Sequence, residues 1–259
     1  MALIKINMNS AVHNMGTSVY VILPQRGAPE NRGGTEKPGP WKTLYLLHGQ
    51  GGDCSEWVRN VPLERYAARH SLAIVMPSGD NSFYSDLQNG MKYQRFLTEE
   101  LIGVCESWFP LSREPKDRFI GGFSMGGYGA LRTAMGAPGL YGKAVGISSL
   151  IDIYTKYRQK GFEDRARMVF GELEQVEENG AELFSAAERM AGEGVCPQFY
   201  LTCGDNDTRF SQSERLHQKL RSLGVSVEFH PAQGDHDYAF ADRAIQKALD
   251  WLVEEREGA

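Results

Sequence analysis

The segment Gly122-Phe123-Ser124-Met125-Gly126 constrains the fold of this chain more than any other feature. It lies where the apolar run Arg118–Phe123 gives way to a helical run, Met125–Met135, that is rich in small residues. A serine between two glycines at a strand-to-helix junction is typical of a nucleophile elbow, in which the strand and the helix approach closely around a tight turn. The sequence therefore predicts Ser124 as a nucleophile at the end of a buried strand.

Short apolar runs alternate with helical patterns along most of the chain, which predicts a mostly parallel sheet with helices on both faces. Together with the elbow, this alternation indicates an α/β-hydrolase fold. The strands are expected at Ser18–Leu23, Lys42–Leu47, Leu72–Met76, Arg118–Phe123, Lys143–Ser148, Gln198–Cys203 and Val225–His230. The helices are expected at Leu63–His70, Tyr93–Phe109, Met125–Met135, Phe210–Leu223 and Tyr238 to about Glu255, and a polar loop at Gln25–Pro40.

The length of the chain, 259 residues, fits one domain over residues 1–259. From Ile151 to Val195 the sequence becomes strongly charged and helical, without a strand pattern. We expect this stretch, residues 151–195, to form a small helical lid inserted after a strand.

A serine hydroxyl needs a base, and in this fold the acid and then the histidine follow the serine in the chain. His13, His48 and His70 precede Ser124 and are out of order. His217 falls within a predicted amphipathic helix, and His230 ends a strand. His236 lies in the loop Gly234-Asp235-His236-Asp237, between the last strand and the last helix. His236 is therefore the predicted general base.

The acid is expected in the loop after the penultimate strand, where Asp205 and Asp207 are both present. Their side chains are two residues apart, so strand alternation does not distinguish them. The aspartate that is not the triad acid would take a turn or helix-capping role.

An oxyanion hole requires two aimed donors. The N–H of Met125, directly after the nucleophile, is the first prediction, and the N–H of Gln50, in the glycine-rich segment Leu47–Gly52, is the second. His48 in the same segment is expected to brace the loop.

Aromatic residues follow the early strands and present two alternatives. Trp57 and Tyr84, with Phe83 and Tyr93, either line a substrate pocket or pack in the core. Periodicity does not separate the two, and Trp57 and Tyr84 are taken as candidate substrate-binding residues.

Composition narrows the range of partners. The net charge is -5 and no run of Lys and Arg forms a basic footprint, which argues against nucleic acid. Apolar stretches are far shorter than the roughly 20 residues needed to span a bilayer. The first ten residues lack a secretory pattern, which predicts a cytoplasmic protein. A homo-oligomer is compatible with the sequence, which does not specify one.

Four cysteines, Cys54, Cys105, Cys196 and Cys203, form no C-x-x-C pair and have no zinc-type spacing to histidine. We expect four reduced thiols, no metal site and no cofactor.

Several motifs together resemble the esterase D-like branch of α/β hydrolases, especially small bacterial tributyrin esterases and cinnamoyl or feruloyl esterases. They are Leu46-Leu47-His48-Gly49 with Gly51-Gly52, Val75-Met76-Pro77, Tyr84-Ser85-Asp86, Gly122–Gly129 and Gly234–Tyr238. The resemblance implies a metal-independent carboxylesterase with a Ser, Asp, His triad. Its usual Gly-x-x-Asp acid loop matches Gly204–Asp207 and so favours Asp207 over Asp205.

The resemblance implies a small-molecule ester as substrate, with short-chain aliphatic or hydroxycinnamoyl acyl groups. Acyltransferases and thioesterases, including S-formylglutathione hydrolases, use the same residues, so the acyl acceptor stays open. A ligand-binding relative without catalysis is a further alternative, against which the complete triad argues.

Overall fold

The computed structural model describes residues 1–25, 39–88 and 90–254. Within these ranges eight strands form one sheet in the order β1-β2-β4-β3-β5-β6-β7-β8. The strands are β1 Ala2–Ser10, β2 Met15–Leu23, β3 Thr43–Leu47, β4 Ala73–Pro77, β5 Arg118–Phe123, β6 Lys143–Ile147, β7 Gln198–Thr202 and β8 Val227–Phe229. The pairs β1–β2 and β2–β4 are antiparallel and every other pair is parallel. The predicted mostly parallel sheet is thus confirmed.

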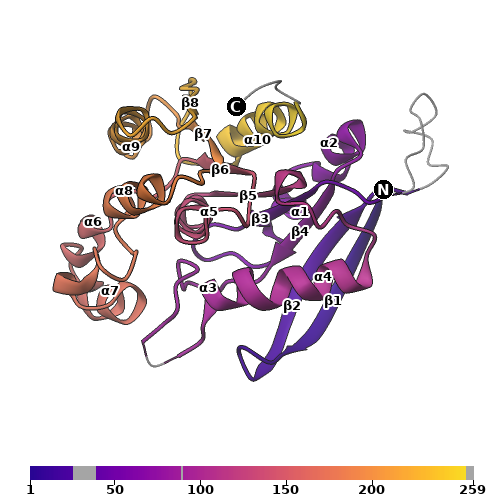
Figure 1. Ribbon diagram of the computed structural model, residues 1–259, viewed down its shortest axis with the longest axis horizontal. Helices are drawn as coiled ribbons and strands as arrows, with labels where there is room; N and C mark the ends of the chain where they lie inside the picture. Colours follow the sequence, from indigo (N-terminus) through magenta and orange to yellow (C-terminus); the bar gives the residue numbers. More distant parts are fainter. Residues whose placement is uncertain (26–38, 89, 255–259) are drawn as a thin grey trace.

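Helices cover both faces of this sheet (Figure 1). One face packs against α1 Glu56–Asn60, α2 Leu63–His70 and α10 Tyr238–Val253. The other packs against α4 Leu101–Trp108, α5 Met125–Gly136, α8 Leu183–Glu193 and α9 Phe210–Ser222, and the short α3 Tyr93–Arg95 precedes α4. The remaining α-helices, α6 Tyr154–Tyr157 and α7 Glu163–Phe170, follow β6.

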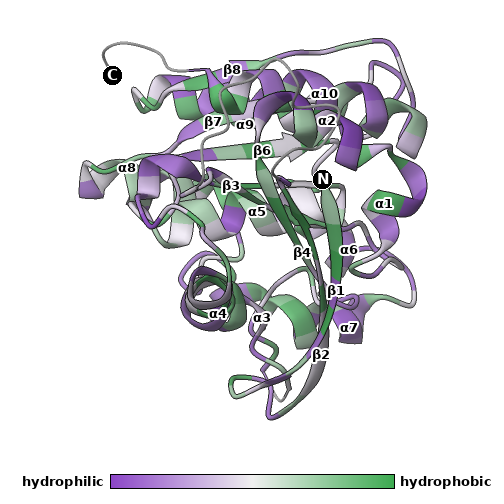
Figure 2. Cartoon of the chain, turned by 90° about the vertical axis from the view of Figure 1, so that its right-hand side faces the viewer, coloured by the Kyte–Doolittle hydropathy of each residue, from purple (hydrophilic) through white to green (hydrophobic). Residues whose placement is uncertain are grey.

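Side-chain alternation along the strands divides the interior into two hydrophobic cores. Leu44 and Leu46 of β3 point toward α2 and α10, whereas Tyr45 and Leu47 point toward α5. All four are buried, which explains why the central strands are continuous apolar runs (Figure 2).

The helix predicted at Tyr93–Phe109 contains a π-helical turn, Phe96–Glu100, between α3 and α4. Glu100 accepts hydrogen bonds there from the Ser10 hydroxyl and from the N–H groups of Ala11 and Val12. This contact ties the helix to the turn between β1 and β2, more than 80 residues away, and local periodicity does not encode it. The loop predicted at Gln25–Pro40 lies mostly outside the described residues.

The segment predicted as a lid divides into two parts. Residues 151–182, with α6 and α7, project beside the sheet and are called the cap here (Figure 1). The last helix, α8, instead packs against α5 and α9 and connects β6 to β7 as part of the central layer. The predicted lid, residues 151–195, thus includes a helix that packs against α5 and α9, and charge pattern alone does not distinguish a crossover helix from an insertion.

Gln212 and Arg132 anchor the cap to the central helices. Gln212 of α9 accepts hydrogen bonds from the N–H groups of Ile151 and Asp152, at 3.1 and 3.0 Å. Arg132 of α5 donates to the carbonyl oxygens of residues 179 and 180. Both ends of the cap are therefore hydrogen-bonded to α5 and α9, two of the helices that pack on the sheet.

Cys54, Cys105, Cys196 and Cys203 are free thiols, as predicted. No helix within residues 1–25, 39–88 and 90–254 combines the length and apolar character needed to cross a membrane. In the same ranges, no three His, Cys, Asp or Glu side chains are grouped as metal ligands.

Candidate active site

Ser124 occupies the turn between β5 and α5 with a backbone φ of 58° and ψ of -112°. Such a positive φ is strained for a residue with a side chain and lifts it out of the strand direction. A Cβ on Gly122 would lie 2.3 Å from the Gly126 carbonyl carbon, and one on Gly126 would lie 2.3 Å from the Leu47 carbonyl oxygen. The strand and helix backbones can approach this closely only because both residues are glycine.

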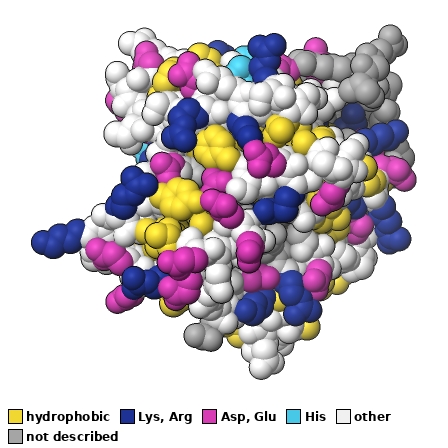
Figure 3. Space-filling model, turned by 60° about the vertical axis from the view of Figure 1, so that its left-hand side comes forward, with side chains coloured by type: hydrophobic (Ala, Val, Ile, Leu, Met, Phe, Trp, Pro, Cys, Tyr) yellow, Lys and Arg dark blue, Asp and Glu magenta, His cyan; other side chains and the backbone are white. Residues whose placement is uncertain are grey.

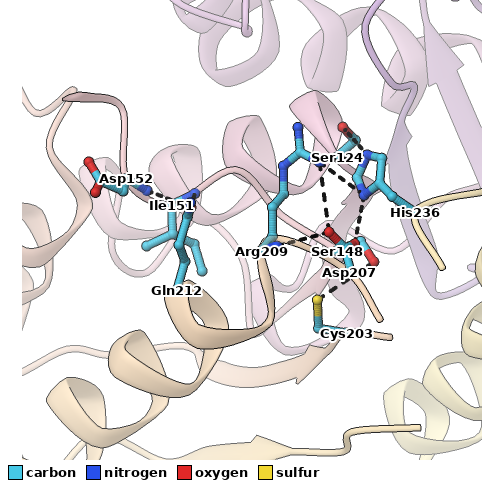
Figure 4. Close-up of polar contacts among 9 residues, drawn as sticks. All are labelled: Ser124, Ser148, Ile151, Asp152, Cys203, Asp207, Arg209, Gln212 and His236. Atoms are coloured by element: carbon cyan, nitrogen blue, oxygen red, sulfur yellow. Dashed lines mark hydrogen bonds and ion pairs between the residues drawn. The ribbon is translucent and has the colours of Figure 1, made fainter. Parts of the chain in front are cut away.

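The three predicted triad residues lie in contact (Figure 4). The Ser124 Oγ is 2.9 Å from His236 Nε2, and His236 Nδ1 is 2.7 Å from Asp207 Oδ2. They come from the loops after β5, β8 and β7, whose carboxyl ends meet at one edge of the parallel sheet. The side chains are therefore arranged as a continuous relay from hydroxyl to carboxylate.

The Asp207 side chain is fully buried and ionised. Burial alone would raise its pKa, but hydrogen bonds from His236, from the Arg209 N–H and from Ser148 outweigh it and lower the pKa to about 2. A carboxylate can only accept hydrogen bonds, so His236 carries its proton on Nδ1 and leaves Nε2 free to accept the serine hydroxyl.

Asp205, the alternative acid, is exposed, and its Oδ1 accepts a hydrogen bond from the N–H of Gly234 at 3.0 Å. This bond joins the loop after β7, which contains Asp205 and Asp207, to the loop after β8, which contains His236. The two loops also approach at Gly204, where a Cβ would lie 2.3 Å from the Gly234 carbonyl oxygen. Asp205 thus supports the backbone before His236, while Asp207 contacts its ring.

The two predicted oxyanion donors belong to segments that border Ser124. Met125 is the first residue of α5, where a helix N–H has no intrahelical acceptor. Gln50 follows Gly49, and a Cβ on Gly49 would lie 3.8 Å from the Ser124 Cβ. The parallel pairing of Leu47 with Gly122 brings the loop that follows β3 to this position.

His48 fixes the same loop. Its Nε2 accepts a hydrogen bond from the Gly79 N–H at 2.9 Å, so its Nδ1 carries the proton and donates to the Gly49 carbonyl oxygen at 2.8 Å. Burial lowers the pKa of His48 and favours the neutral ring. Both nitrogens are engaged with backbone, as expected for a bracing residue.

Trp57 and Tyr84, the candidate substrate-binding residues, are each only 1% exposed. The Trp57 indole N–H donates to the Leu47 carbonyl oxygen at 3.0 Å, and the Tyr84 hydroxyl accepts from the His48 N–H at 2.9 Å. This burial does not support direct contact with substrate and favours the packing alternative. The two rings hold the backbone that leads into the predicted oxyanion loop.

Arg209 is a site residue that sequence reasoning missed. Its Nη1 lies 3.0 Å from Nδ1 and 2.9 Å from Nε2 of His236 (Figure 4). The side chain is 20% exposed and precedes α9 as its N-cap residue. The only signal in the sequence is its position two residues after Asp207, and no motif marks it.

Comparison with known proteins gives the family. The Esterase family profile matches residues 10–252. The chain is also 30% identical to an acetyl esterase of Caldicellulosiruptor saccharolyticus over 261 residues, which cover 97% of this chain and 98% of the relative. The chain belongs to the Esterase family.

Two solved structures from Staphylococcus aureus are similar to this esterase. One is FphF, a fluorophosphonate-binding serine hydrolase, with a TM-score of 0.88, 30% identity and coverage of 98% of this chain and 99% of the other. The second is the S-formylglutathione hydrolase FrmB, with a TM-score of 0.85 and the same identity and coverage. The α/β-hydrolase fold and the esterase D-like resemblance are confirmed, and the protein is a carboxylic ester hydrolase.

Replacing Gly126 by alanine should destabilise this esterase by roughly 1 to 3 kcal/mol, because the added Cβ overlaps the backbone of β3. Urea unfolding of the purified variant measures the loss. Gly103→Ala in α4 is a matched control, since nothing lies within 4 Å of its added Cβ, and it should gain up to about 1 kcal/mol. Equal stability of the two variants would show that the close approach is not needed.

The ionised state of Asp207 should contribute to stability in a pH-dependent way. Because its pKa is about 2 when folded and higher when unfolded, the contribution is complete above about pH 4 and is lost as the pH falls toward 2. The difference in unfolding free energy between the wild type and Asp207→Asn should shrink by about 1 kcal/mol between pH 6 and pH 3. Urea unfolding at pH 6, 4 and 3 tests this. A difference that stays constant would contradict it.

Proposed function

We propose that this protein is a serine carboxylesterase that hydrolyses short-chain acyl or hydroxycinnamoyl esters through an acyl-enzyme. In this proposal Ser124 is the nucleophile, His236 the general base and Asp207 the acid that orients the imidazole. The observation that carries it is a continuous chain of two hydrogen bonds. One spans 2.9 Å from Ser124 Oγ to His236 Nε2, and the other spans 2.7 Å from His236 Nδ1 to Asp207 Oδ2.

The reaction begins when the Ser124 Oγ attacks the ester carbonyl carbon and passes its proton to His236 Nε2. The N–H groups of Met125 and Gln50 stabilise the oxyanion that forms. The tetrahedral intermediate expels the alcohol, which takes the proton from Nε2, and leaves an acyl group on Ser124. Water, deprotonated by the same nitrogen, then attacks the acyl-enzyme. The second tetrahedral intermediate breaks its bond to Ser124 Oγ, which takes the proton back from Nε2, and the carboxylic acid is released.

His236 becomes positively charged each time Nε2 takes a proton, and its surroundings stabilise that charge. Asp207 stays ionised at neutral pH and accepts the hydrogen bond from Nδ1–H. The ring stacks on Phe123, with centroids 4.8 Å apart and an interplanar angle of 26°. These contacts support one orientation of the imidazole, with Nε2 directed at the serine.

The cap supports a preference for small acyl groups. Under it, the side chains of Phe83, Tyr128, Phe162 and Phe170 form a buried aromatic cluster with edge-to-face contacts. These side chains fill the apolar layer under the cap, and hydrogen bonds hold both ends of the cap in place. The layer therefore offers little space for a long acyl chain. The similarity to an acetyl esterase is consistent with this preference.

A thioesterase activity is the second candidate, because one structural neighbour is an S-formylglutathione hydrolase. The same nucleophile and base would serve an ester or a thioester, since the acyl-enzyme is identical. Comparing kcat/KM for phenyl acetate and S-phenyl thioacetate distinguishes the two.

Replacement of Ser124 by alanine should leave the fold intact and lower kcat on phenyl acetate by roughly 10⁴ to 10⁶. Circular dichroism checks the fold, and intact mass after treatment with a fluorophosphonate checks the nucleophile, since only the wild type should gain the adduct. A folded variant with a tenth of the wild-type kcat would overturn the assignment of Ser124.

The two acid variants should behave differently. Asp207→Asn should lower kcat by roughly 10² to 10⁴, because an amide can hold the imidazole in the wrong tautomer. Asp205→Asn is the matched control, and we expect it to cost mainly stability, about 1 kcal/mol or less, through its bond to Gly234. If Asp205→Asn were the inactive variant, the acid would be Asp205.

A further inference from the structure

The Arg209 guanidinium lies beside the imidazole of His236. It has more N–H donors than there are hydrogen-bond acceptors around it. It carries five N–H bonds and accepts none. Its Nε is buried and has no hydrogen-bond partner within the described part of the chain. Its Nη1 lies 3.9 Å from Asp207 Oδ1, and that oxygen already accepts the Arg209 backbone N–H.

His236 does not supply the missing acceptor. Its Nδ1 donates to Asp207, and its Nε2 is the atom that must accept the Ser124 hydroxyl. The Nη1 of Arg209 lies almost equally far from both ring nitrogens, so it sits over the face of the imidazole and does not share the in-plane lone pair of Nε2. The ring therefore offers the guanidinium no hydrogen-bond acceptor.

Lys156, from α6 of the cap, brings a second positive charge close to Arg209. The ammonium lies 5.1 Å from the centre of the Phe162 ring and 3.1 Å from Gln159 Oε1. Ile151 and Asp152, shortly before Lys156 in the chain, bind Gln212 three residues after Arg209, so the segment that leads into α6 is held at the start of α9. Burial and the positive charge of Arg209 both lower the pKa of Lys156, in agreement with this placement.

Carboxylates near the cap have other partners. Asp152 accepts the Tyr154 N–H, and Figure 4 shows its carboxylate pointing away from Arg209. Glu177 accepts from the Tyr154 hydroxyl. The face of the molecule in Figure 3 intersperses basic and acidic side chains and shows no continuous basic surface.

Proton transfer makes His236 an imidazolium as the oxyanion forms, so it leaves the net charge of the site unchanged and does not neutralise Arg209 or Lys156. A carboxylate on the substrate would offset these two positive charges and accept the N–H donors of Arg209. Such a charge would act in the transition state as well as in binding.

We propose that Arg209 and Lys156 form a subsite for a carboxylate carried by the ester substrate, close to the scissile carbonyl. The inference rests on the esterase function proposed above and names its substrate class as small esters that bear a carboxylate. The carboxylate belongs either to the acyl group, as in a half-ester of a dicarboxylic acid, or to the alcohol, as in an ester of a hydroxy acid.

Matched ester pairs test the proposal and locate the carboxylate. Phenyl hemisuccinate and phenyl succinamate differ by carboxylate against amide in the acyl group, and 4-acetoxybenzoate and 4-acetoxybenzamide differ in the same way in the leaving group. After subtraction of the uncatalysed rate, the wild type should favour the carboxylate in at least one pair by roughly tenfold or more in kcat/KM. The preference should weaken in 0.5 M NaCl.

Variants assign that preference to the two cations. Lys156→Gln and Arg209→Gln should each reduce the ratio of carboxylate to amide severalfold, whereas Arg209→Lys should retain part of it. Lys160→Gln, which removes an exposed charge of the same cap segment, is the control and should leave the ratio unchanged.

The outcomes separate this subsite from the esterase function. Hydrolysis of the amide esters without any carboxylate preference, or a preference that survives in both glutamine variants, would overturn the subsite and leave the esterase function intact. Failure of the folded wild type to hydrolyse any of the four esters, and phenyl acetate as well, would contradict both.

Discussion

The arrangement of the site depends on the contact between the backbone of α5 and the ends of β3 and β5. Because Gly122 and Gly126 carry no side chains, the helix can begin immediately beside the Leu47 carbonyl. Ser124, with its positive φ, and Met125, the first residue of α5, lie in the turn that this contact closes. The proposed nucleophile, the predicted oxyanion loop and the helix N-terminus therefore meet at one close backbone contact.

The segment from Asp207 to Gln212, which ends in the first turn of α9, connects the rest of the site to the cap. Asp207 accepts a hydrogen bond from His236, Arg209 lies beside the imidazole, and Gln212 binds the start of the cap. Six consecutive residues thus join the proposed acid to the cap.

Patterns that depend on neighbouring residues could be predicted from the sequence. The helix Leu63–His70 and the strand Arg118–Phe123 have the predicted bounds, because apolar periodicity and local propensity determine them. Ser124 and His236 could be named in advance, since a strand-to-helix junction and the chain order of this fold restrict where a nucleophile and its base can lie.

The family resemblance already favoured Asp207 over Asp205, and the tertiary structure adds the physical difference between them: the turn after Gly204 buries Asp207 beside the imidazole and leaves Asp205 exposed. The tertiary structure also placed Trp57 and Tyr84 in the core and Arg209 at His236. These features depend on contacts between residues about 10 to more than 30 positions apart. A local pattern predicts that a side chain is apolar or charged, but what it touches is decided when the loops at the end of the sheet meet.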